Sequence, residues 1–128
     1  MIKSKFIQDI LILLLDGEEE DEEAKKQMHF VSETEFDYTG VGVFVSFEHV
    51  DGIEKFKAKK GDLILNGVTI KSPELEIGAE STLFFKNGLI DYLEIWSFNG
   101  EYPKKELSEY EMKQEWVSSH ERKIERKK

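Results

Sequence analysis

The stretch FFKNGLIDYLEIWSFNGEYP, residues 84–103, decides the predicted fold of this chain. Apolar and aromatic residues flank the pair Asn87-Gly88, and Asn-Gly strongly favours a two-residue hairpin turn because both residues tolerate positive φ angles. The stretch therefore predicts an antiparallel hairpin whose arms are residues 81–86 and 89–98. We expect the rest of a sheet to form around this hairpin.

Further turn dipeptides divide the neighbouring sequence. They are Asp51-Gly52, Asn66-Gly67 and Asn99-Gly100. We expect the first two to close hairpins, and residues 74–77 to form a short extra strand. The arms of these hairpins are predicted to be 41–50 with 53–59 and 62–65 with 68–71. Such short intervals leave no room for crossover helices, so the sheet, of roughly five to seven strands, should be mostly antiparallel.

The N-terminal residues predict a helix that is amphipathic at its start and apolar all round at its end. Its apolar residues are Phe6, Ile7, Ile10, Leu11, Leu13, Leu14 and Leu15. Such a helix end needs cover on more than one side, either from the sheet plus a second helix or from another copy of the chain. Asp16 and Glu19 have the spacing of a capping box, which predicts a short second helix over residues 17–28.

The C-terminal part of the chain follows Pro103, where the sheet is expected to stop. Residues 104–116, KKELSEYEMKQEW, predict a short helix or irregular segment that returns Leu107, Tyr110 and Trp116 to the body. The ending HERKIERKK, residues 120–128, has five basic residues against two acidic ones, so we expect a solvated, disordered tail.

The remaining residues, 1–119, have the size of one domain. The predicted fold is α+β, with the N-terminal amphipathic helix and the short second helix packed on the mostly antiparallel, hairpin-built sheet. No internal repeat is visible in the spacing of the glycine turns, which argues against a propeller or solenoid.

The composition narrows the classes of partner. The 128 residues include 27 acidic and 18 basic side chains, for a net charge of −9, which repels phosphate backbones and anionic lipid and steers the chain toward basic partners. We therefore expect no nucleic-acid and no membrane partner. The absence of cysteine excludes disulfides and thiolate metal sites, and cytoplasm is the expected location. The N-terminus imitates an export signal only in part, because Asp9 interrupts its apolar run and no small-residue cleavage site follows.

No stretch of the sequence matches a catalytic, metal-binding or nucleotide-binding motif. The chain has three histidines, His29, His49 and His120, without the spacing of a ligand pair on a helix. Glu48, His49 and Asp51 can bind a cation or shuttle a proton, but charged residues beside a turn are more often solvated. Gly40 and Gly42 lack the third glycine of a dinucleotide-binding loop and more readily make room for a neighbouring ring or a bulge. We predict no catalytic residue, no metal and no cofactor.

Glu94 stands among aromatic residues in the predicted strand 89–98. Alternation places Ile90, Tyr92, Glu94, Trp96 and Phe98 on one face and Leu89, Asp91, Leu93 and Ile95 on the other. Three interpretations of this carboxylate are open: it pairs with a Lys or Arg of this chain, it meets a basic side chain of a partner, or it acts as a catalytic acid. Tyr and Trp around a carboxylate are typical of a protein-binding surface.

A second acidic feature is the row Glu33, Glu35 and Asp37, which alternation directs to one side of a strand. Such a row either protects a solvated edge strand from aggregation or forms a docking surface for a basic protein. The predicted partner-binding residues are Glu33, Glu35, Asp37, Tyr92, Glu94 and Trp96.

The stretch at residues 84–103, together with FDYTGVGVFVSFEH at 36–49, resembles small uncharacterised bacterial proteins that are encoded beside polymorphic toxins as immunity proteins. The likeness covers about residues 36–116, and its pattern is an aromatic strand, Asn-Gly, and then Leu-Glu-aromatic. The resemblance implies a non-enzymatic acidic protein that occupies the active site or a surface of a basic toxin, often a nuclease.

The sequence thus predicts an acidic protein-binding module, an immunity-like inhibitor of a basic toxin or another basic partner. Two other classes stay open. One is a small-ligand-binding protein or enzyme with a pocket between helix and sheet, where Glu94 or His49 supplies the polar group. The other is a self-associating structural subunit that forms a homodimer through the crowded N-terminal helix.

Overall fold

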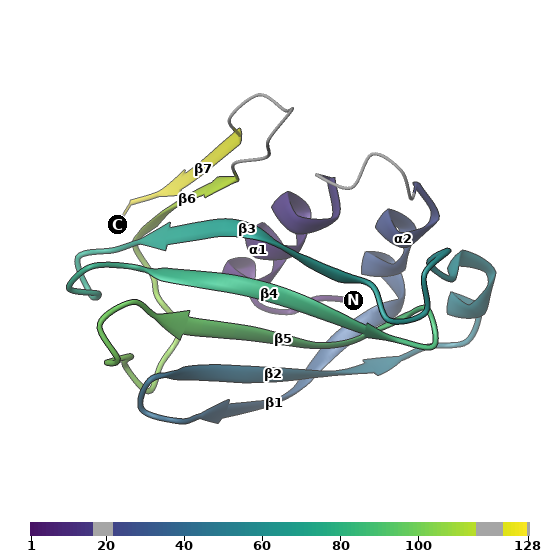
Figure 1. Cartoon of the computed structure of the whole chain (residues 1–128), viewed down its shortest axis with the longest axis horizontal. Coiled ribbons are helices and arrows are strands. Elements are labelled where there is room, and N and C mark those ends of the chain that lie inside the picture. Colours follow the sequence, from purple (N-terminus) through teal and green to yellow (C-terminus); the bar gives the residue numbers. More distant parts are fainter. Residues whose placement is uncertain (17–21, 115–121, 128) are drawn as a thin grey trace.

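The computed structural model of the protein describes residues 1–16, 22–114 and 122–127. The predicted α+β fold is confirmed: an N-terminal helix and a short second helix pack with an antiparallel sheet that has seven strands in the described part of the chain (Figure 1). The helices are α1 (Lys5–Asp16), α2 (Glu22–Lys26), and the 3₁₀ helices η1 (Gln27–Phe30) and η2 (Ile53–Phe56). The strands are β1 (Val31–Tyr38), β2 (Gly42–His49), β3 (Ile64–Lys71), β4 (Ala79–Lys86), β5 (Leu89–Ser97), β6 (Tyr110–Gln114) and β7 (Arg122–Arg126).

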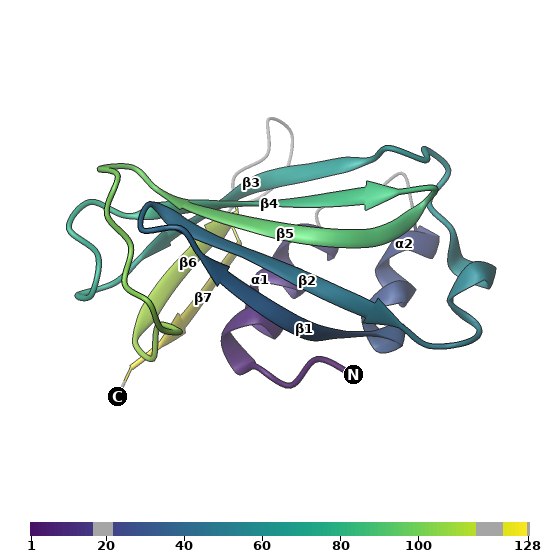
Figure 2. The same cartoon turned by 90° about the horizontal axis from the view of Figure 1, so that it is seen from below.

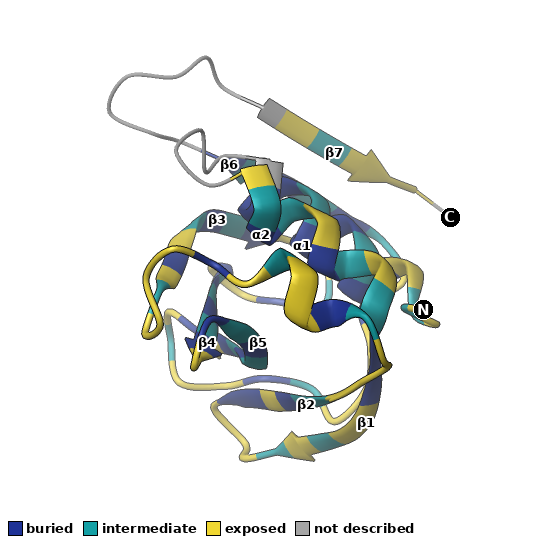
Figure 3. Cartoon of the chain, turned by 90° about the vertical axis from the view of Figure 1, so that its right-hand side faces the viewer, coloured by how far each residue is buried: buried dark blue, intermediate teal, exposed yellow. Residues whose placement is uncertain are grey.

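The strands lie in the order β1-β2-β5-β4-β3-β6-β7, and each neighbouring pair is antiparallel. A β1–β2 hairpin is joined through β5 to the β3–β4–β5 meander, and the chain then crosses back to place β6 beside β3. Both α-helices lie on one side of the sheet, which curves around them (Figures 2 and 3). We call the opposite side the outer face.

The core lies between α1 and the sheet, because α1 is apolar nearly all round. Ile7, Ile10 and Leu14 are completely buried, and each such side chain contributes about 1.5–3 kcal/mol on burial. The sheet contributes Val43, Val45, Leu65, Ile70, Leu83, Leu93 and Ile95 to the same cluster. The cover that the sequence requires for α1 is therefore present within one copy of the chain.

Only one of the predicted Asn-Gly and Asp-Gly hairpins forms. Asn87 (φ +54°) and Gly88 (φ +80°) close the β4–β5 hairpin as predicted. Asn66-Gly67 instead lies inside β3, where Gly67 (φ +99°) sits at a bulge against β4, because the positive φ that suits a tight turn also suits a bulge. The predicted arms 62–65 and 68–71 are thus parts of a single strand.

The other predicted turns and strands also need correction. Asp51-Gly52 leads into η2 and joins no hairpin, so the predicted arm 53–59 is wrong. The β2 strand pairs with β1 through a short turn at Gly40 (φ +91°). Residues 74–77 are not a strand and belong to the loop that closes the β3–β4 hairpin.

The second helix is shorter than predicted. Within the expected 17–28, α2 covers Glu22–Lys26 and continues as the 3₁₀ helix η1. The buried Gln27 fixes this region, because its amide nitrogen donates to the carbonyl oxygens of Phe56 (2.7 Å) and Gly88 (2.8 Å), and its amide oxygen accepts from Ile90 N (2.9 Å). The predicted capping box at Asp16 and Glu19 lies outside the described side chains.

The C-terminal segment is a strand where the sequence indicated a helix or irregular structure. Residues Tyr110–Gln114 form β6, and Leu107 and Tyr110 are buried as expected, whereas Trp116 lies outside the described residues. Tyr110, Met112 and Gln114 face the core, and Glu111 and Lys113 alternate with them. Burial thus alternates with a period of two, although the charged residues between the buried ones make the segment look unlike a strand in sequence.

Residues Arg122–Arg126, expected to be part of a solvated tail, form β7 and pair with β6. Much of β7 is exposed (Figure 3), and its ion pairs hold it in place: Lys123 lies 3.3 Å from Glu111, and Arg126 Nε lies 3.0 Å from Asp9 Oδ2. The predicted domain boundary at residue 119 therefore falls before a strand of the same sheet.

Asp9 is the polar centre of this end of the molecule. Its carboxylate is completely buried on α1 and accepts hydrogen bonds from the Tyr110 hydroxyl (2.7 Å) and from Arg126 Nε (3.0 Å) and Nη2 (3.2 Å). Burial, and next the hydrogen bond to Asp9, raise the pKa of the Tyr110 phenol. The carboxylate that interrupts the apolar helix therefore ties α1 to β6 and β7.

Candidate functional site

The outer face of β1, β2, β5 and β4 carries most of the predicted partner-binding residues. Residues directly opposite each other in neighbouring strands point to the same side of a sheet. One cross-strand row runs Asp37, Phe44, Glu94, Thr82, and the next runs Glu35, Ser46, Tyr92, Phe84. A third places Trp96 opposite Glu80. Val43 and Val45, which alternate with Phe44, are buried on the helix side, so these rows lie on the outer face.

Aromatic rings on this face contact one another and remain open to solvent. The Phe84 and Tyr92 rings stack with centroids 4.5 Å apart, and Phe44 lies 6.1 Å from Tyr92. Trp96 makes an edge contact with Phe98 at 5.2 Å. Phe44 is 37% exposed, Trp96 38% and Phe98 44%, so the rings form an apolar strip that no described part of the chain covers.

Glu94 lies within this aromatic strip. Its strand neighbours across the ladders are Phe44 on β2 and Thr82 on β4, and Tyr92 and Trp96 lie two residues away on the same face. The Glu94 side chain is half-buried and forms no ion pair with a described residue. The interpretation that Glu94 pairs with a Lys or Arg of this chain therefore has no partner among residues 1–16, 22–114 and 122–127.

Three other carboxylates of this face also lack an ion pair with a described residue. Glu35 and Asp37 on β1 are exposed, and Glu80 on β4 is half-buried. None of them forms an ion pair within the described part of the chain. Within the described residues, the acidic charge of the outer face is thus not neutralised by an ion pair.

Glu33 does not belong to this surface, contrary to the alternation that grouped it with Glu35 and Asp37. The β1–β2 register shifts between Glu33 and Glu35, so that Thr34 is an extra residue and Glu33 pairs with Phe47 on the helix side. The buried Glu33 carboxylate accepts hydrogen bonds from the backbone amides of Lys3 (2.9 Å) and Ser4 (2.8 Å), at the start of α1. A carboxylate at a helix N-terminus is stabilised by the helix dipole, which gives Glu33 a structural role.

A second bulge corrects the predicted faces of β5. The pairing with β4 shifts between Tyr92 and Ile90, so that Asp91 is the extra residue. Ile90 is therefore completely buried with Leu93 and Ile95, rather than lying beside Tyr92 on the outer face. Simple alternation made this strand apolar on both sides, and the bulge transfers one apolar residue to the core.

Gly42 allows β2 and β5 to approach closely. A Cβ atom at this position would overlap the carbonyl oxygen of Ile95 and lie 2.9 Å from the Cα of Trp96. The sequence predicts that Gly42 makes room for a ring on a neighbouring strand or allows a bulge, whereas the group that needs this room is the backbone of β5. Gly42 therefore sets the position of Trp96 on the outer face.

The cluster at Glu48, His49 and Asp51 has internal partners. The His49 Nε2 hydrogen-bonds with the carbonyl oxygen of Ile90, and Glu48 accepts a hydrogen bond from Ser32 Oγ at 3.2 Å. Asp51 is exposed. Within the part of the chain that the structure describes, no three His, Cys, Asp or Glu side chains are grouped as metal ligands.

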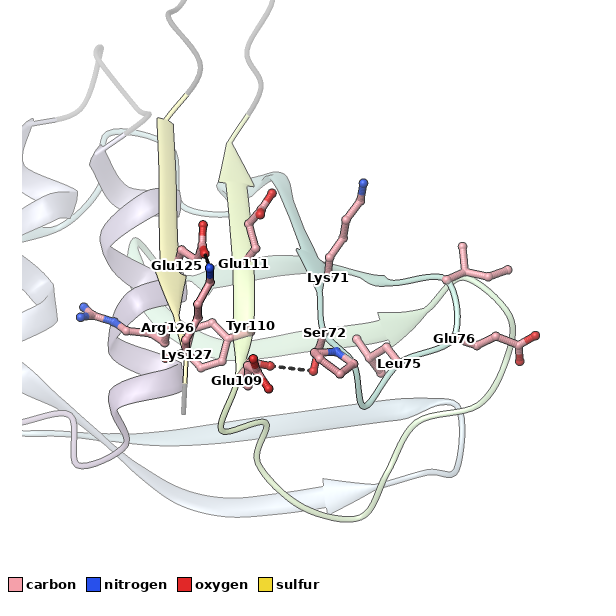
Figure 4. Close-up of a pocket in the computed structure, with 12 residues that line it drawn as sticks. Lys71, Ser72, Leu75, Glu76, Glu109, Tyr110, Glu111, Glu125, Arg126 and Lys127 are labelled. Atoms are coloured by element: carbon pink, nitrogen blue, oxygen red, sulfur yellow. Dashed lines mark hydrogen bonds and ion pairs between the residues drawn. The ribbon is translucent and has the colours of Figure 1, made fainter.

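A surface pocket of about 360 Å³ lies at one end of the sheet, between the loop after β3 and the strands β6 and β7 (Figure 4). Polar groups of its lining already contact one another. Lys127 lies 2.9 Å from Glu125, and the Ser72 hydroxyl donates to the Glu109 carbonyl oxygen at 2.7 Å. This is not the location between helix and sheet at which the sequence places a ligand pocket, because α1 contributes none of its lining residues.

Comparison with protein-family models, curated proteins and solved structures finds no match to this chain. No helix in the described residues is long and apolar enough to span a membrane.

Proposed function

We propose that this chain is a non-enzymatic acidic module that binds a basic protein through the outer face of its sheet, in the manner of an immunity-like inhibitor of a basic toxin. The observation that carries the proposal is a strip of exposed aromatic rings interspersed with carboxylates that have no ion-pair partner among the described residues. Aromatic residues are enriched at the centres of protein interfaces, and complementary charge accelerates association.

The proposed contacts are five of the six residues selected from the sequence: Glu35, Asp37, Tyr92, Glu94 and Trp96. Phe44 joins them, since it lies between Asp37 and Glu94 in one cross-strand row. The sequence analysis gives Phe44 no role, and its 37% exposure distinguishes it from the neighbouring core valines. Glu33 is left out because its carboxylate is occupied by backbone amides.

The net charge of −9 supports the choice of a basic partner. Long-range attraction raises the association rate, and the effect falls as salt screens the charges. The curvature of the sheet supports a projecting mode of binding, since the outer face is the one turned away from the helices (Figure 3). Such a surface suits entry into a concave site on the partner.

The proposal is tested by capture from a lysate of the source organism in which the protein encoded next door is also expressed. The wild-type chain is compared with the double variant Glu35→Lys/Asp37→Lys. Its matched control is Asp51→Lys/Asp62→Lys, which reverses the same charge at two exposed positions in turns. A basic protein recovered in stoichiometric amount by the wild type and the control, but not by the outer-face variant, supports the proposal.

The captured partner then allows a kinetic test. At low salt the association rate of the outer-face variant should fall by about tenfold or more relative to the control, and the difference should shrink as salt is added. Equal recovery by all three chains would contradict the assignment of the outer face. Retention of a small molecule without any protein partner would favour the ligand-binding alternative.

A further inference from the structure

The surroundings of Glu94 are chemically specific. Glu94 pairs with Phe44 on one neighbouring strand and with Thr82 on the other, and Tyr92 and Trp96 lie two residues before and after it on β5. Same-face neighbours along a strand are about 7 Å apart, and directly opposite neighbours about 5 Å. One anionic group is therefore bordered by three aromatic side chains on the outer face.

This arrangement rests on rigid elements. Tyr92 is stacked on Phe84 with an interplanar angle of 13° and is also in contact with Phe44, so its ring is held from two sides. Trp96 lies against Phe98 and pairs with Gly42. The close approach of β2 and β5 at this position leaves no room for a side chain on residue 42. Glu94 itself sits in the centre of a continuous ladder between β2 and β4. A partner group would meet a site whose rings are already ordered.

We propose that Glu94, with Phe44, Tyr92 and Trp96, forms a receptor for an arginine side chain of the partner protein. The inference rests on the proposed function and names the chemistry at its centre. A guanidinium group offers a planar fork of donors to a carboxylate and stacks on aromatic rings, whereas a lysine ammonium is a more strongly hydrated point charge that can do only part of this.

Charge on the same face indicates a second basic group. Asp37 lies in the same cross-strand row as Glu94, two strands away, with Phe44 between them. At about 4.8 Å per strand spacing, the two residues lie about 10 Å apart, close to the roughly 9 Å between positions i and i+3 of a polyproline II segment, whose side chains point to the same side. A partner segment in this conformation, with arginine at Glu94, therefore places a second basic side chain near Asp37 when two residues separate the two.

The test uses two synthetic probes of equal charge, the blocked peptides Gly-Arg-Gly-Gly-Arg-Gly and Gly-Lys-Gly-Gly-Lys-Gly, titrated at low salt into the full chain. Amide and indole NMR signals report where they bind, and the variant Trp96→Phe assigns the Trp96 indole signal. We expect the arginine peptide to shift the Trp96 indole and the amides of residues 92–96, with an affinity at least about threefold above that of the lysine peptide.

The matched variants are Glu94→Gln, which keeps the size of the side chain, and Asp62→Asn as an exposed control off this face. Glu94→Gln should weaken the arginine peptide by about tenfold and remove its preference over lysine, whereas Asp62→Asn should leave that preference unchanged. If the two peptides bind this face equally, or Glu94→Gln has no effect, the arginine site is refuted while the proposed function stands. If neither peptide binds the outer face, the arginine site is refuted, and the capture experiment alone decides the proposed function.

Discussion

Replacing Glu33 with alanine is expected to lower the free energy of unfolding by about 3 kcal/mol, although the sequence groups this residue with two solvated acids. Glu33 is 6% exposed, and its carboxylate accepts hydrogen bonds of 2.9 Å from Lys3 N and 2.8 Å from Ser4 N. A hydrogen bond to a charged group is worth about 1.5–3 kcal/mol, and a carboxylate at a helix N-terminus gains a further few tenths. The lower end of the sum applies because Lys3 is exposed, so water can replace part of the loss.

Urea denaturation followed by circular dichroism measures this change. With a urea m-value of about 2 kcal/mol/M, a loss of about 3 kcal/mol lowers the midpoint by about 1.5 M. The melting temperature should fall by about 11 °C, since 128 residues at about 2.1 cal/mol/K each give an unfolding entropy of about 270 cal/mol/K. Glu35→Ala and Asp37→Ala are the controls and should each change stability by less than about 0.5 kcal/mol. A Glu33→Ala loss no larger than the losses of these two controls would refute the structural role of Glu33.

Three further substitutions test the packing. Tyr110→Phe should cost about 1.5–3 kcal/mol at neutral pH in the same assay, because the hydroxyl donates to buried Asp9. Because the folded-state pKa of Tyr110 is raised, its contribution to the free energy of unfolding is complete below pH ~10 and is lost as pH rises through the folded-state pKa. The phenylalanine variant should therefore lose less stability in alkali than the wild type does. Tyr102→Phe should leave thermal stability unchanged or raise it, because the buried Tyr102 hydroxyl has no hydrogen-bond partner among the described residues; a loss above about 1 kcal/mol contradicts this. Gly42→Ala should cost more than about 2 kcal/mol, since its Cβ would overlap Ile95 O, and an unchanged melting curve would exclude that close approach.

The α+β class and the β4–β5 hairpin could be predicted from local patterns alone. The apolar period of the N-terminal residues matches a helix, and Asn87-Gly88 closes the hairpin with the two positive φ angles that its residue types favour. The same reasoning failed at Asn66-Gly67, because a bulge inside a strand demands the same backbone conformation as a turn. Only the identity of the neighbouring strand decides between the two, and that is a tertiary property.

The C-terminal strand β6 was missed for a different reason. Tyr110, Met112 and Gln114 are all buried with a period of two, which is a strand pattern. One of the three is a glutamine, however, and its amide donates to the carbonyl oxygen of Leu13 on α1, so the inward polar residue weakened the apolar alternation. A search for alternating buried positions would find this strand if it allowed one of the buried residues to be polar and hydrogen-bonded.

Five of the six residues predicted to bind a partner share the outer face, whereas Glu33 lies on the helix side; their binding role stays a prediction. Alternation places Glu35 and Asp37 together, and it places Tyr92, Glu94 and Trp96 together. The register β1-β2-β5 then brings both groups to the same side, which no single-strand pattern can show. Thr34 gives no local signal of a bulge, since threonine is an ordinary strand residue.

The two bulges that alter the predicted faces occur at the same level of the sheet. In β1 the register shifts between Glu33, which pairs with Phe47, and Glu35, which pairs with Ser46. In β5 it shifts just beyond Tyr92, which pairs with the same Ser46 from the other side of β2. Below this level Glu33 and Ile90 turn toward α1, where one caps the helix and the other joins the core. Above it, the outer face retains the acidic and aromatic residues without either of these two. Because a one-residue change of register exchanges the two faces of a strand, the β1 bulge gives α1 its Glu33 cap, and the two bulges together keep Glu33 and Ile90 off the outer face.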